Sequence, residues 1–128
     1  MAEWTRIERG KPQVRGIDHE ASGLLDVRIE LSRTPPRRWD HFFMNPTGLD
    51  MPVGMHSPRL EGPTVRIRPP HDQLRQYVEH VDARIAHANS RYEREVLPQI
   101  EEQQAQVRAQ EDEREERLEK ARREAEEL

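Results

Sequence analysis

Apolar and polar residues alternate without a break in two short segments of the chain, residues 25–31 and 64–68. A β-strand places successive side chains on opposite faces of a sheet, so each segment is expected to have one buried face and one wet face. Both segments therefore predict strands of a sheet that is covered on one side only. If the two strands are neighbours, Arg28 and Glu30 lie beside Arg66 and Arg68 on the wet face.

A pair of prolines follows each predicted strand, at residues 35–36 and 69–70. Proline cannot donate to a β-ladder, and its fixed φ suits the first turn of a helix. The first pair predicts a short helix to about residue 43, with Thr34 as its N-cap. The second pair predicts a much longer helix, with Asp72 in its first turn. The short helix is expected to place its aromatic side chains on the sheet, namely Trp39, Phe42 and Phe43.

The apolar positions of the long helix recur in steps of four and three residues from Leu74 to Tyr92, which is a heptad pattern. These side chains either complete the core of the domain or form an interface between copies, and the pattern does not decide between the two. The candidate interface residues are Val78, Val81, Ile85, Ala88 and Tyr92.

Two steps of four residues from Tyr92 through Val96 to Ile100 interrupt the heptads, and Pro98 lies within them, so a kink or break is expected there. Beyond it, residues 98–128 are rich in Glu, Arg, Gln and Ala and predict a helical extension. Its apolar stripe is weak. A solvated single helix, a loose dimeric coiled coil and a helix ordered by a partner all remain open.

Two other regions are less regular. Residues 4–9 and 13–17 predict short strands around a turn at residues 10–12, and residues 21–23 predict another turn. Residues 44–62 contain three prolines and three glycines without periodicity, and predict a long loop that holds Met44, Met51 and Met55. A loop of that length is usually functional or mobile.

The charge is divided unevenly along the chain. The whole chain has a net charge of −4 and is 36% charged and 33% hydrophobic, whereas residues 99–128 alone hold 11 acidic and 6 basic residues. The remaining residues are nearly neutral, and only they are expected to bury a core. The chain has no cysteine, no segment with the features of a signal peptide, and no apolar run of membrane-spanning length. We therefore expect a cytoplasmic protein that does not enter a membrane.

The sequence offers no set of residues typical of an active site. The six histidines include His80 and His87, which are seven residues apart on one helix face and too distant to chelate one ion. His71 and Asp72 have no nucleophile beside them, and no glycine-rich phosphate loop occurs. We expect no catalytic residue, no cofactor and no metal, and hence no enzyme.

Arginines from the two strand-to-helix segments form a candidate anion or nucleic-acid patch if the strands are adjacent. Trp39 and Phe42 would support nucleic-acid binding by stacking if they are exposed. Against this, the domain is nearly neutral and the tail is acidic. The patch residues are Arg28, Arg33, Arg37, Arg38, Arg66 and Arg68.

Together these patterns predict an α+β fold, with a small antiparallel or mixed sheet, one short helix and one long helix. The domain is expected at residues 1–97, and a charged helical or coiled-coil extension at residues 98–128. The expected role is a non-enzymatic protein–protein interaction or assembly module. The expected partner is a second copy in a homodimer, or another protein, bound through the long C-terminal helix. The alternative is a nucleic-acid-binding accessory protein that uses the arginine patch.

Overall fold

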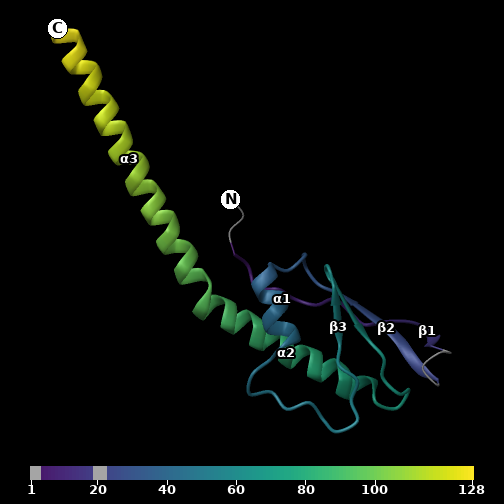
Figure 1. Ribbon diagram of the computed structural model, residues 1–128. Helices are drawn as coiled ribbons and strands as arrows, with labels where there is room; N and C mark the ends of the chain where they lie inside the picture. Colours follow the sequence, from purple (N-terminus) through teal and green to yellow (C-terminus); the bar gives the residue numbers. More distant parts are fainter. Residues whose placement is uncertain (1–3, 19–22) are drawn as a thin grey trace. The chain divides into compact units, whose positions relative to one another are not determined.

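The computed structural model describes residues 4–18 and 23–128. A four-stranded antiparallel sheet with strand order β1-β2-β4-β3 is combined with helices, so the predicted α+β fold is confirmed (Figure 1). The elements in chain order are β1 (Gln13–Asp18), β2 (Leu24–Glu30), α1 (Arg37–Met44), β3 (Arg59–Glu61), β4 (Thr64–Ile67), α2 (Leu74–Glu95) and α3 (Leu97–Glu127).

The chain forms two compact units, Met1–Tyr92 and Glu93–Leu128. The first unit holds the sheet, α1 and most of α2, and the second holds α3. The domain boundary expected after residue 97 stays a prediction. Within residues 4–18 and 23–128, no helix combines the length and the apolar character that crossing a membrane requires.

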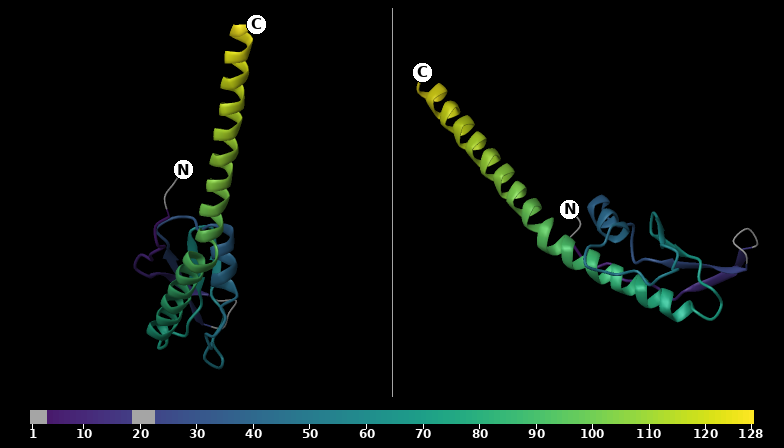
Figure 2. Two further views of the ribbon diagram at one scale, coloured as in Figure 1. Left: turned by 90° about the vertical axis from the view of Figure 1, so that its left-hand side faces the viewer. Right: turned by 60° about the horizontal axis from the view of Figure 1, so that its bottom comes forward.

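The two central strands have one buried face, as their alternating patterns predict. Val27, Ile29, Val65 and Ile67 are at most 1% exposed, and α2 lies against this side of the sheet in both sets of views (Figures 1 and 2). Their polar neighbours in sequence point to the opposite face, because side chains alternate along a strand. The sheet is therefore covered by α2 on one face and is open on the other.

The strand β3 lies inside the segment that we expected to be a structureless loop, so that expectation is wrong at this end. Leu60 is paired with Val65 of β4, and the two strands are joined through Gly62 and Pro63. Gly62 has a φ of +59°, a left-handed conformation that glycine adopts without strain. Because β3 has only three residues, it has no alternation long enough to be seen in the sequence.

The strand expected at residues 4–9 is absent. Only Arg9 pairs with a strand neighbour, through an isolated bridge to Leu31. The backbone of Ile7 instead bonds to the side chain of Asn89 in α2, through its N–H at 3.1 Å and its carbonyl at 2.9 Å. The side chain of Asn89 therefore takes the place that a neighbouring strand would have as the hydrogen-bond partner of Ile7. The strand at residues 13–17 is confirmed as β1, and residues 21 and 22 of the expected turn at 21–23 lie outside the described residues.

The helices begin later than the sequence indicated. The N-cap of α1 is Pro36 rather than Thr34, and the carbonyl of Pro36 accepts the first helical bond, from the N–H of Asp40. The first turn of α2 contains no acidic residue, because α2 begins at Leu74 and Asp72 precedes it. In both places the segment after the proline pair stays extended or turned before the helix begins, so neither expected capping residue is in position.

The break expected near Pro98 is confirmed. The helix α2 ends at Glu95, Val96 is not helical, and Pro98 lies in the first turn of α3. Proline lacks an N–H, and the first turn is where a helix needs none. The break therefore falls at Val96, two residues before the proline.

Candidate functional site

The residues that we considered for an interface along α2 are mostly part of the core of a single chain. Val81, Ile85, Ala88 and Tyr92 are at most 7% exposed. Val78 alone is half-buried, and it lines a shallow, open hollow with Leu74 and Arg75. The heptad pattern left open whether these side chains complete the core or form an interface, and these four are part of the core. A surface for a partner has to be sought elsewhere.

Two buried polar groups fix the packing of α2. The Oδ1 atom of Asn89 accepts hydrogen bonds from the N–H of Ile7 and, at 2.9 Å, from Nε1 of Trp39. Arg84 donates to the Nε2 atom of His80 at 2.8 Å and to the carbonyl of Phe43 at 3.0 Å. Burial, together with the charge of Arg84, lowers the pKa of His80, which keeps the imidazole neutral and able to accept this bond. Both groups join segments far apart in sequence, which is a structural role.

The helix α3 differs from α2 in that none of its 31 residues is buried, whereas α2 buries eight side chains. Two large apolar side chains on α3, Val107 and Leu118, are 52% and 51% exposed. They are eleven residues apart, close to three helical turns, so they lie on the same face of the helix. We call the face through these two residues the α3 stripe. It consists of Gln104, Val107, Glu111, Arg114, Leu118, Ala121 and Ala125.

The charged residues beside the α3 stripe support the helix itself. Arg117 bonds to Glu113 at 2.7 Å, and Arg123 bonds to Glu119 at 2.8 Å, both in the favourable i,i+4 order. Such exposed pairs favour a helix without binding anything. They explain why α3 is helical although it has no core side.

On the open face of the sheet, three arginines form a row across three adjacent strands. Arg66 in β4 lies directly opposite Arg28 in β2 and directly opposite Arg59 in β3. Arg68 follows Arg66 by two residues and so lies on the same face. The next row along the strands is acidic: Glu30 accepts a hydrogen bond from Thr64 at 2.9 Å, and Glu61 is paired with Thr64 from the other side.

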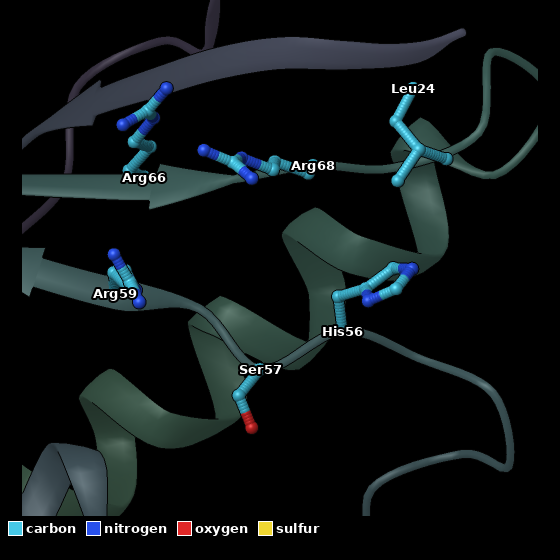
Figure 3. A pocket seen from close by; sticks show the side chains of 6 residues that line it. All are labelled: Leu24, His56, Ser57, Arg59, Arg66 and Arg68. Atoms are coloured by element: carbon cyan, nitrogen blue, oxygen red, sulfur yellow. The ribbon is translucent and has the colours of Figure 1, made fainter. Parts of the chain in front are cut away.

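A pocket of about 280 Å³ opens beside the arginine row, on the side that faces away from these acidic residues. Figure 3 shows Arg66 on β4, Arg68 on the segment that follows β4, and Arg59 on β3, with the hydroxyl of Ser57 directed away from the three guanidinium groups. We call this hollow the arginine pocket. The described residues that line it are Leu24, His56, Ser57, Arg59, Arg66 and Arg68.

Half of the predicted arginine patch comes together in this way. The row and the pocket contain Arg28, Arg66 and Arg68, whereas Arg33 donates to the carbonyl of Thr5 at 2.9 Å and lies over the ring of Trp4. The other two predicted members belong to α1, and neither lines the pocket. They are Arg37 and Arg38.

The aromatic side chains expected to stack on bases are buried. Trp39 is 0% exposed and Phe42 is 3% exposed, and Phe42 is covered by the guanidinium groups of Arg38 and Arg91. Four pocket residues were not predicted, namely Leu24, His56, Ser57 and Arg59, and the last three of them lie in the short strand β3 or in the loop before it. Arg59 belongs to the arginine row because it is paired with Arg66. This relation can be recognised only when the pairing of β3 with β4 is known.

Comparison of the chain with protein-family models, with curated proteins and with solved structures gave no match. Within the part of the chain that the structure describes, no three His, Asp or Glu side chains are grouped so as to hold a metal ion. The two surfaces that merit a functional argument are the α3 stripe and the arginine pocket.

Proposed function

We propose that this protein is a non-enzymatic assembly module that self-associates through α3. The observation that carries the proposal is the α3 stripe, a face of a helix with no buried residue on which Val107 and Leu118 remain half exposed. A stripe of this kind, with its positions in steps of three and four residues, is the pattern by which helices pair. The predicted interface therefore moves from α2, where the apolar residues are buried, to α3.

The charged residues within the α3 stripe favour an antiparallel pair. When two copies of α3 are paired antiparallel with Val107 opposite Leu118, Glu111 of each copy lies opposite Arg114 of the other. The two charges that interrupt the stripe then neutralise each other at the centre of the pair. A twofold axis at this point makes the contact self-complementary, as in most homodimers.

The residues beside the stripe agree with the same register. On one side of the stripe, Glu101 comes close to Arg122 of the second copy, and Arg108 comes close to Glu115 of the second copy. Both pairs have opposite charge. On the other side of the stripe each pair contains one amide, Gln103 with Glu124 and Gln110 with Arg117, so this side adds little repulsion.

A parallel pair in register would be disfavoured by the same residues. Glu111 would face Glu111 and Arg114 would face Arg114 within the interface. Beside the stripe, Arg117 would meet Arg122 of the second copy. Like charges in such positions select against a pairing. We therefore take the antiparallel pair as the form of the assembly.

The assembly is expected to be weak. Val107 and Leu118 of both copies provide four large apolar side chains, each worth about 1.5–3 kcal/mol on full burial. Association itself costs about 4–15 kcal/mol. The difference predicts a dissociation constant in the micromolar range or weaker, so the dimer should form and dissociate with concentration.

Replacing both apolar residues, as in the double variant Val107→Glu/Leu118→Glu, is expected to abolish the dimer. The change removes the apolar contact and adds negative charge, while glutamate keeps a high helix propensity. The measurement is the solution mass by light scattering over a range of protein concentrations. The wild-type chain should rise from about 15.2 kDa toward twice that mass, and the variant should stay at the lower value.

The matched control is Ala105→Glu/Ala109→Glu, which adds the same charge on the opposite face of α3 and should still dimerise. A wild-type chain that is monomeric at every concentration would contradict the proposal. Equal loss of the dimer in the test and control variants would place the contact outside the α3 stripe.

A further inference from the structure

We infer that the arginine pocket binds a small phosphate monoester. This inference does not rest on self-association, because the pocket belongs to the sheet and the α3 stripe to another unit. The pocket brings together three guanidinium groups, from β3, from β4 and from the residue that follows β4, and none of the described residues that line it is a carboxylate (Figure 3).

The arginine row is unfavourable without an anion. Like charges directly opposite each other on adjacent strands destabilise a sheet, and Arg66 has an arginine on both sides. Asp26 pairs with Arg66 at 3.3 Å and supplies one negative charge. Arg59 makes no hydrogen bond or ion pair with another described residue and is exposed. The row thus retains positive charge that a bound anion would neutralise.

The number and type of donors match a phosphate group. A guanidinium presents parallel N–H donors that fit two oxygens of a phosphate or carboxylate at once. Each guanidinium has five N–H donors, so even with Arg66 paired to Asp26 and with Arg68 taking part in another interaction, the three groups offer more donors than the two oxygens of one carboxylate can accept. A phosphate monoester has three terminal oxygens and a charge close to −2 at neutral pH. It therefore satisfies the set better than a single carboxylate does.

The size and the remaining wall of the pocket indicate a small molecule. A volume of about 280 Å³ is slightly below that of ordinary ligand sites, which start near ~300 Å³. Leu24 adds an apolar wall against which a short organic group can pack. A nucleic-acid strand would require a longer basic track or stacking aromatics, and the aromatic side chains that we expected to stack are buried.

The test is calorimetric titration of the full chain with phenyl phosphate at constant, low ionic strength. Inorganic phosphate is titrated in parallel, to show whether the organic group adds affinity. We expect saturable binding of one phosphate group for each chain. Replacing Arg59, as in Arg59→Gln, should weaken binding by roughly tenfold or more, because a charge-assisted pair of hydrogen bonds is lost.

The matched control is Arg37→Gln, which removes the same charge from an exposed arginine outside the pocket and should leave the affinity within about twofold. The inference is overturned if neither phosphate compound binds at millimolar concentration. It is also overturned if both variants lose the same affinity, which would indicate a general charge effect. The inference is overturned as well if a single-stranded oligonucleotide binds and phenyl phosphate does not displace it. That result would indicate that the arginines bind nucleic acid instead.

Discussion

The variant Asn89→Ala is expected to lower the free energy of unfolding of the first unit by about 3 kcal/mol or more. Three buried groups lose their partner: the N–H and the carbonyl of Ile7 and the indole N–H of Trp39. An orphaned buried donor or acceptor costs about 1–3 kcal/mol. Because the stability of a whole domain is about 5–15 kcal/mol, this one side chain accounts for a large part of it.

Denaturant unfolding followed by tryptophan fluorescence measures this effect in the full chain. Both tryptophans, Trp4 and Trp39, belong to the first unit, so the signal reports that unit alone. The control is Ser90→Ala, the exposed neighbour of Asn89 in α2, which should change the stability by no more than about 0.5 kcal/mol. A loss below about 1 kcal/mol for Asn89→Ala would contradict the role assigned to this residue.

The second large effect is expected from charge reversal at the centre of the α3 stripe. In the antiparallel pair, Glu111→Arg places an arginine opposite Arg114 of the second copy, twice in each dimer. We expect the dimer to weaken by roughly tenfold or more, since one attractive contact becomes repulsive at each site. Adding Arg114→Glu in the same chain exchanges the two charges and should restore the dimer. Sedimentation equilibrium of the single and double variants measures both changes.

The charge exchange separates the two orientations. In a parallel pair, residue 111 always faces residue 111, so the exchanged chain has the same repulsion as the wild type and nothing is rescued. A single variant that dimerises as strongly as the wild type would contradict the antiparallel register, because this result is expected of a parallel pair or of an interface outside residues 111 and 114. Recovery in the exchanged chain is the specific sign of the antiparallel register.

The sequence predicted those parts of the fold that have a clear period. The alternation in β2 and β4 identifies their buried residues, and the proline near the heptad interruption marks the end of α2. The strand β3 and the extended segment before β1 could not be predicted in this way. The strand β3 has only three residues, too few to show an alternating pattern. The backbone of Ile7 is bonded to Asn89, which is 82 positions away in sequence.

The candidate sites show the same limit. The pattern along α2 was compatible with a core or with an interface, and only the buried fractions of Val81 and Ile85 show that the residues serve the core. The arginines Arg28 and Arg66 were predicted to be neighbours if their strands were. Arg59 was missed because its position beside Arg66 depends on the pairing of β3 with β4. No pattern in the sequence near Arg59 indicates this pairing.

The central claim is that two copies of α3 pair antiparallel, and a distance between spin labels tests it directly. The chain has no cysteine, so Asp112→Cys and Glu126→Cys each give one label site on each copy. Residue 112 lies at the centre of the proposed pair, so its two labels should be separated mainly by the spacing of the helix axes, about 8–10 Å, and by the length of the labels. Residue 126 lies opposite residue 99 of the second copy, so its labels should be separated by about 40 Å along the axis, at 1.5 Å per residue. A short distance at both sites would mean a parallel pair, and the absence of any dipolar signal at residue 112 in concentrated protein would contradict self-association through α3.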